Sequence, residues 1–231
     1  MADKPDKKGK PEGKKPPRDQ GGKPGGDKGK KGKGKAEGAA GEPEVPAAPA
    51  PPARLAVMYR ETVVPRLREA LGRTNPNSLP RLEKICLNMG VGKAIDDSKI
   101  LDEAQKAMTA VAGQAAVVTK SRTSISNFKL RKGYKIGCRA TLRGARMWEF
   151  FDRLVSIAIP RIRDFHGLGR KAFDKAGNYG LGIEELTIFP EIDADRMTHA
   201  FGMDVNFVIR NARSSGESLA FLKMMGMPFA E

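Results

Sequence analysis

The chain changes character sharply near residue 54, and this change limits which part of it can fold. Residues 1–53 hold 11 glycines and 10 prolines, with Lys-Gly repeats around residues 28–35. A segment of this composition cannot bury enough apolar surface to offset the conformational entropy that folding costs. We therefore predict a disordered basic extension over residues 1–53 and one folded domain over residues 54–231.

The positive charge of the chain is carried by both parts. The chain has 42 Lys and Arg and 27 Asp and Glu, of which residues 1–53 hold 13 basic and 8 acidic residues. Residues 54–231 therefore hold 29 basic and 19 acidic residues, a net charge of +10. A folded part that is basic on its own account attracts polyanions, so nucleic acid or an anionic membrane surface are the natural partners. The extension could be a basic arm that adds nonspecific attraction to RNA, or a solubilising tail.

Several classes of protein do not fit the sequence. The longest apolar run, residues 154–159 with one Ser inside it, is far too short to span a bilayer. The first 53 residues lack the apolar core of a signal peptide, and their eight acidic residues argue against a mitochondrial transit peptide. We expect a cytoplasmic protein with no membrane partner. Cys86 and Cys138 give neither a disulfide framework nor a zinc-binding spacing, so we interpret them as half-buried strand residues.

Hydrophobic periodicity after residue 54 alternates between helical and strand spacing. Helical spacing is found in residues 59–71, 101–111, 147–158 and 219–225. Pro65 implies a kink or a late start in the first of these, and Ser214 with Glu217 forms a capping box before the last. Strand spacing is found in residues 82–89, 117–120, 136–143, 181–189 and 203–210. We predict an α+β fold of about five mostly antiparallel strands with helices packed on the sheet.

Alternation along residues 82–89 assigns their side chains to two faces of a half-buried strand. Glu83, Ile85, Leu87 and Met89 share one face. Lys84, Cys86 and Asn88 point the other way. Lys84 and Asn88 are either simply exposed to solvent or, if this strand is a neighbour of residues 136–143, on the same sheet face as the polar side chains of that strand.

Residues 136–143 alternate in the same way. Ile136, Cys138, Ala140 and Leu142 point one way, and Arg139, Thr141 and Arg143 point the other. Two guanidinium groups that flank a hydroxyl can hold phosphates through forked hydrogen bonds. The residue pattern of this strand therefore predicts a phosphate-binding face.

Residues 104–148 carry ten Lys or Arg and no Asp or Glu, although about six acidic residues would be expected in a segment of this length. The ten are Lys106, Lys120, Arg122, Lys129, Arg131, Lys132, Lys135, Arg139, Arg143 and Arg146. Solvated surfaces usually mix both signs of charge, so this exclusion favours RNA binding.

The middle of this stretch, residues 121–135, is predicted to be a basic loop. Phe128 and Tyr134 lie among its cations, a combination suited to contact with RNA bases and sugars. We expect one of Ile125 and Phe128 to pack into the core instead.

No catalytic constellation is recognisable in the sequence. The G-x-G of residues 90–92 lacks the third glycine and the acidic ribose ligand of a dinucleotide site. His166 and His199 have no Cys or spaced His nearby, and Asp193 with Asp195 is more typical of a turn than of a cation site. We expect no enzyme activity, no metal site and no cofactor.

A series of ordered motifs in this sequence resembles the bacterial large-subunit ribosomal protein L5 family, whose members bind 5S rRNA. The motifs are residues 87–92 (LNMGVG), 128–134 (FKLRKGY), 136–138 (IGC), 141–144 (TLRG), 160–165 (PRIRDF), 173–174 (FD), 177–179 (GNY), 189–193 (FPEID), 202–204 (GMD) and 227–229 (MPF). The resemblance covers about residues 55–231. It departs from the usual family pattern at Lys135, His166, Lys175 and Ala176.

This resemblance implies a structural protein of the central protuberance that helps attach 5S rRNA to 23S rRNA, beside neighbouring central-protuberance proteins. In the family, the sheet face and adjoining turns hold 5S rRNA. Together with Arg139 from the polar strand face, the candidate 5S rRNA-binding residues are Asn88, Met89, Gly90, Lys120, Arg139, Thr141, Arg143 and Gly144.

The resemblance also implies two further surfaces. Residues 121–135 would reach P-site tRNA, with candidate contacts Arg122, Ser124, Phe128, Lys129, Arg131, Lys132, Tyr134 and Lys135. Residues 161–185 would face small-subunit ribosomal protein thirteen across the subunit bridge, with candidate contacts Arg161, Arg163, Asp164, Phe165, Asn178 and Tyr179. A free RNA chaperone or nonspecific nucleic-acid-binding protein is the alternative, because a basic tail and a basic sheet would serve either role.

Overall fold

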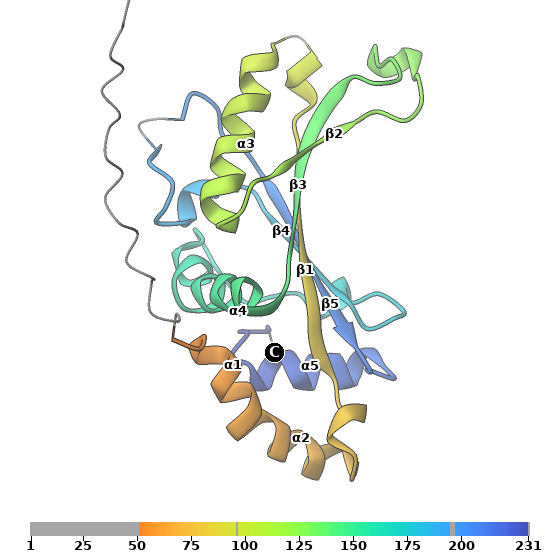
Figure 1. The fold of residues 1–231 in the computed structure, drawn as a ribbon, viewed down its shortest axis with the longest axis vertical. Coiled ribbons are helices and arrows are strands. Elements are labelled where there is room, and N and C mark those ends of the chain that lie inside the picture. Colours follow the sequence, from red (N-terminus) through yellow and green to blue (C-terminus); the bar gives the residue numbers. More distant parts are fainter. Residues whose placement is uncertain (1–50, 96, 195–196, 231) are drawn as a thin grey trace, which may run out of the picture. The chain divides into compact units, whose positions relative to one another are not determined.

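A five-stranded antiparallel sheet forms the centre of this computed structural model, in the order β2-β3-β1-β5-β4 (Figure 1). The strands are β1 (Arg81–Gly90), β2 (Val117–Lys120), β3 (Lys135–Leu142), β4 (Tyr179–Ile183) and β5 (Met203–Arg210). The structure describes residues 51–95, 97–194 and 197–230, so the predicted extension lies outside the described residues as far as residue 50.

Helices pack mainly on one side of the sheet, where α3 and α4 lie (Figure 1). The α-helices of the described chain are α1 (Arg54–Met58), α2 (Val64–Leu71), α3 (Ser98–Ala112), α4 (Gly144–Arg153) and α5 (Ser215–Met224). The predicted α+β class is therefore confirmed. None of the helices in the described ranges is long and apolar enough to cross a membrane.

Two prolines shape the helical segments that the periodicity predicted. A π-helical turn, Tyr59–Val63, joins α1 to α2 just before Pro65, and a second, Leu154–Ala158, extends α4 toward Pro160. Proline has no amide hydrogen and clashes with the carbonyl four residues earlier, so the regular ladder must change in the preceding turn. The first helical segment continues past Pro65 to Leu71, and the second ends at Arg161.

The helix ends follow the capping residues in the sequence. The Asp97 side chain accepts a hydrogen bond from the Lys99 amide at 2.9 Å, and Gly113 ends α3 in the left-handed conformation, with φ 63°. Ser214 caps α5 by accepting from the Glu217 amide. The Glu217 carboxylate bonds the Arg213 amide rather than that of Ser214, so the capping box is shifted by one residue.

Two details of the strand predictions are wrong. The pairing of β1 with β5 shifts register between Leu82 and Lys84, so Leu82 and Ile85 are both buried and Glu83 is exposed instead of sharing the face of Ile85. The strand predicted over residues 181–189 is β4, which begins earlier and stops at Ile183. A 3-10 turn, Leu186–Ile188, follows it and buries Leu186 through helical rather than strand geometry.

The hydrophobic core lies between the helices and the inner face of the sheet, where Ile85, Leu87, Val205 and Phe207 are buried. Tyr59 joins several helices at one end of this core, because its ring stacks on Trp148 at 5.5 Å and meets Phe221 edge-on at 5.9 Å.

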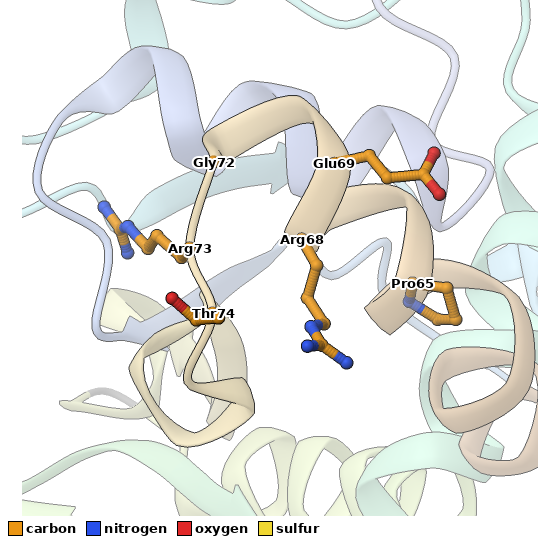
Figure 2. Close-up of a pocket in the computed structure, with 6 residues that line it drawn as sticks. All are labelled: Pro65, Arg68, Glu69, Gly72, Arg73 and Thr74. Carbon is orange, nitrogen blue, oxygen red and sulfur yellow. The ribbon is translucent and has the colours of Figure 1, made fainter.

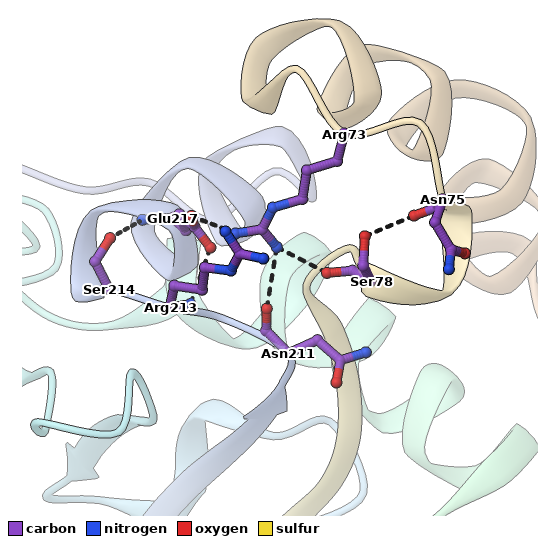
Figure 3. Close-up of polar contacts among 7 residues, drawn as sticks. All are labelled: Arg73, Asn75, Ser78, Asn211, Arg213, Ser214 and Glu217. Carbon is purple, nitrogen blue, oxygen red and sulfur yellow. Dashed lines mark hydrogen bonds and ion pairs between the residues drawn. The ribbon is translucent and has the colours of Figure 1, made fainter.

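Arg73 ties the segment after α2 to the segment before α5 (Figure 3). Its guanidinium donates to the carbonyl oxygens of Ser78, at 2.7 Å, and Asn211, at 3.2 Å, and pairs with the Glu217 carboxylate. Both charged side chains are largely buried, with exposed fractions of 11% and 18%. Arg73 thus links the segments before β1 and after β5 by hydrogen bonds, and it links both to α5 by an ion pair.

Candidate nucleic-acid interface

The face of the sheet opposite the core, called the outer face below, carries a row of exposed residues that crosses all five strands. Pairing between neighbouring strands places Gly182 beside Asp204, Asp204 beside Asn88, Asn88 beside Arg139 and Arg139 beside Val117. All five are exposed. The sequence predicted that Arg139 and Asn88 share one face if their strands are neighbours. The strands are neighbours, and the two residues are direct cross-strand partners.

A second row lies next to the first. Cys86 of β1 pairs with Thr141 of β3 on one side and with Asn206 of β5 on the other, and Asn206 pairs with Gly180 of β4. Cys86 and Thr141 are half-buried, and the Asn206 side chain is exposed. The outer face thus combines cationic, amide and hydroxyl groups with two glycines at one edge.

The other candidate 5S rRNA-binding residues are spread around this face. Arg143 and Gly144 follow β3 and are exposed, and Gly144 begins α4 with φ 61°. Gly90 ends β1, and Lys120 ends β2 opposite Lys135. Met89 differs from the rest, because its side chain is 1% exposed and belongs to the core. Any contact between Met89 and RNA must use its main chain.

The cations of the acid-free stretch have no acidic partners within the described residues. None of its ten Lys and Arg side chains forms an ion pair there. Elsewhere Arg54 pairs with Asp152 and Arg153 with Glu191. The charges of the stretch are therefore available to an anionic ligand.

Residues 121–134 form an extension of the β2–β3 hairpin held by its own hydrogen bonds. The Ser121 amide donates to the Tyr134 carbonyl at 2.7 Å, and Ile125 and Leu130 exchange two bonds of 3.0 Å nearer the tip. Between them lies a short 3-10 turn, Ser126–Phe128, followed by Lys129 with φ 53°. The backbone of this predicted loop is thus organised as a hairpin.

The hairpin side chains point to solvent. All eight candidate tRNA contacts are exposed, from Arg122 to Lys135. The expectation that Ile125 or Phe128 enters the core is wrong, since they are 42% and 67% exposed. The extension projects past the sheet, as Figure 1 shows, so no second layer covers its apolar side chains.

The candidate bridge residues divide into two groups. Arg161, Arg163 and Asp164 are exposed, and Phe165 is half-buried against the core. Asn178 and Tyr179 instead hold the fold together.

Asn178 stabilises a turn next to β5. Its amide nitrogen donates to the Asp174 carboxylate at 2.8 Å, and its amide oxygen accepts from the Ile209 amide at 3.1 Å. The hydrogen bond from Asn178 lowers the pKa of Asp174 below its usual value. Tyr179 is buried, donates its hydroxyl to the Gly169 carbonyl at 3.2 Å, and has a raised pKa because of that burial.

One hollow of the described chain lies beside the C-terminal end of α2. It is lined by Arg68 and Arg73, whose side chains point in different directions (Figure 2). Arg73 is moreover engaged with Glu217. Among the described residues, no group of three or more His, Cys, Asp and Glu side chains could hold a metal ion.

The residues of the outer face that the sequence interpretation did not single out include Asp204, Asn206 and Gly182. Alternation in residues 203–210 predicts that Asp204 and Asn206 point away from Val205 and Phe207. Their position on the same face as Arg139 depends on the strand order, which the alternation does not contain.

Two family models match the five strands of the sheet and residues 121–131 of the hairpin. The family described as "Ribosomal protein L5" matches residues 75–131, and the "ribosomal L5P family C-terminus" matches residues 135–229. A curated relative, large ribosomal subunit protein uL5 of Shewanella sp. (strain ANA-3), is 52% identical over 177 residues, which are 77% of this chain and 98% of the relative. All five strands of the outer face lie within the matched segments.

Proposed function

Because this chain belongs to the ribosomal protein L5 family, we propose that it binds 5S rRNA through its outer face and helps attach that RNA to 23S rRNA in the central protuberance. As a family member it is a structural, non-enzymatic protein of the large subunit of the cytoplasmic ribosome, with rRNA as its partner. The proposal concerns which RNA each surface holds.

The observation that carries the 5S rRNA assignment is the set of unpaired cations around β3. Arg139 is exposed on the outer face, and Arg143 is exposed directly after the end of β3. Thr141, which carries a hydroxyl, lies between them in the sequence. Guanidinium groups with no carboxylate partner can each hold a phosphate through two parallel hydrogen bonds. Exposed Asn88, next to Arg139, adds a neutral donor and acceptor for bases or riboses.

The hairpin of residues 121–134 is the proposed contact for P-site tRNA. It presents Phe128 and Tyr134 among exposed cations, and aromatic rings next to positive charge suit the bases and backbone of folded RNA. It extends beyond the sheet, so it can contact a second RNA while the outer face holds the first.

Residues 161–164 are the proposed contact for small-subunit ribosomal protein thirteen. Exposed Arg161, Arg163 and Asp164 carry both signs of charge. Mixed charge suits the polar rim of a transient protein interface better than it suits an RNA backbone.

The experiment that tests the 5S rRNA assignment is salt-dependent binding of the full chain to transcribed 5S rRNA. We expect Arg139→Ala with Arg143→Ala to weaken binding and to lower the slope of log affinity against log salt by about 0.7 to 0.9 for each lost phosphate contact. Arg66→Ala with Arg68→Ala removes the same charge from exposed positions of α2 and should leave both unchanged. Unchanged affinity and slope in the first variant would contradict the assignment.

A hairpin variant separates the two RNA surfaces in the same assay. Replacing residues 122–133 by Asn-Gly leaves a two-residue turn between Ser121 and Tyr134, which already pair. This variant should bind 5S rRNA almost as the parent does, while ribosomes that contain it retain P-site tRNA less well. Equal affinity of the parent chain for 5S rRNA, tRNA and duplex DNA would favour a free RNA chaperone instead.

A further inference from the structure

One carboxylate lies in the middle of a face that is otherwise suited to phosphate. Asp204 is exposed in the outer-face row between Gly182 and Asn88. Within the described part of the chain its carboxylate pairs with no cation, and the Asn88 amide donates to it at 3.5 Å. That distance is at the long limit of a hydrogen bond, so most of the acceptor capacity of Asp204 remains free.

A carboxylate at this position has no use in binding phosphate, which it repels. Asp204 is two strands away from Arg139, a separation of about 10 Å at the usual spacing of strands. The outer face therefore has a cationic side on β3 and an acceptor side on β5. One extended nucleotide can span such a distance between its phosphate and the far edge of its base.

The strand next to the acceptor side lacks outward side chains. Gly180 and Gly182 both face outward on β4, opposite Asn206 and Asp204. A Cβ on Gly182 would meet no atom within 4 Å, and one on Gly180 would lie 3.1 Å from the Asn206 amide oxygen. Glycine weakens a strand, and its presence inside one often marks the close approach of a ligand. These two leave a low strip on which a flat base fits.

We propose that Asp204 binds the Watson–Crick edge of one unpaired guanine, with Gly182 and Asn206 beside it. Guanine presents two donors side by side, the N1–H and the N2 amino group, which match the two oxygens of a carboxylate. Adenine and cytosine offer one amino group, and uracil offers one N–H between two acceptors that a carboxylate repels. The inference rests on the proposed binding of RNA phosphates along β3 and adds the selection of a base.

The test uses labelled uridine heptamers with a central guanosine or a central inosine, which lacks the N2 amino group. Fluorescence anisotropy with the full chain should give at least about fivefold tighter binding of the guanosine heptamer. Asp204→Asn, which retains the size of the side chain, should bring the ratio close to one. Gly182→Val should do the same by covering the strip, because valine suits a strand and its Cβ would meet no atom within 4 Å.

Glu69→Gln is the matched control, since it removes one exposed carboxylate from α2 and should leave the ratio unchanged. A ratio near one in the parent chain, or a ratio that survives in both Asp204→Asn and Gly182→Val, would overturn the inference. Arg139→Ala with Arg143→Ala should weaken all heptamers equally. If that double variant binds like the parent, the proposed binding of phosphates along β3 is wrong. If instead only the Asp204→Asn and Gly182→Val results disagree with expectation, the selection of a base is wrong and the phosphate face stands.

Discussion

Single charged side chains differ widely in what they contribute to this fold, and burial decides the difference. Arg54 and Asp152 form an ion pair in which the Arg54 side chain is 72% exposed. Solvent screens such a pair, and ordering two long side chains costs entropy, so it contributes little. Arg73 is 11% exposed and satisfies two carbonyl oxygens and a carboxylate at once. Its removal would take away this donor from both carbonyl oxygens and leave the Glu217 carboxylate with the Arg213 amide but without its cation.

We predict that Arg73→Met lowers the free energy of unfolding by about 2 kcal/mol, because the methionine keeps much of the apolar stem but leaves the Glu217 carboxylate unpaired. Arg54→Met should lower it by less than about 1 kcal/mol. Urea denaturation followed by circular dichroism measures both values. Equal effects of the two substitutions would show that burial does not separate these pairs.

Among the strands, β1 and β3 approach each other so closely at one point that only glycine fits. A Cβ on Gly137 would lie 2.5 Å from the Met89 carbonyl oxygen and 3.1 Å from the Thr119 hydroxyl. Moving the backbone of β1 away would disturb the core, because the Met89 side chain is buried there. Gly90, the pairing partner of Gly137, has open space around its Cα.

We predict that Gly137→Ala destabilises the protein by about 1 to 3 kcal/mol, since the added methyl must push β1 and β3 apart. Gly90→Ala makes the same chemical change in open space and should alter stability by less than about 1 kcal/mol, in the stabilising direction. Thermal unfolding of the two variants gives the comparison. A tolerated Gly137→Ala would mean that the sheet can relax there.

At the scale of the whole molecule, the buried core of the described chain runs from Leu55 to Met227. The helices and the inner face of the sheet therefore close one core among themselves. The composition of residues 1–53 predicts that this segment adds charge rather than packing. We therefore expect its role to be separate from the stability of the domain.

We predict that removing residues 1–50, which lowers the net charge from +15 to +10, changes the free energy of unfolding by less than about 0.5 kcal/mol. The shortened chain should also keep its preference for 5S rRNA over duplex DNA. A smaller salt slope for the shortened chain would identify the extension as an RNA-attracting arm, and an unchanged slope would identify it as a solubilising tail. A large loss of stability would contradict the predicted division at residue 53.

Much of the local structure could be predicted from the sequence, because short-range signals determine it. The helical spacing of residues 101–111 predicted α3, and the two faces of β3 followed from the alternation of Arg139 and Thr141 with apolar residues. The lack of acidic residues in residues 104–148 likewise indicated that the cations of this stretch have no acidic partners nearby in the sequence.

What the sequence could not determine depends on contacts between distant segments. The bulge beside Glu83, the exposure of Phe128 and the structural roles of Met89 and Tyr179 each follow from which elements pack together. The same holds for the outer face. Alternation alone determines that a side chain leaves the core, whereas only the strand order β2-β3-β1-β5-β4 brings Asp204 onto one surface with Arg139, because that order is set by packing across the whole sheet.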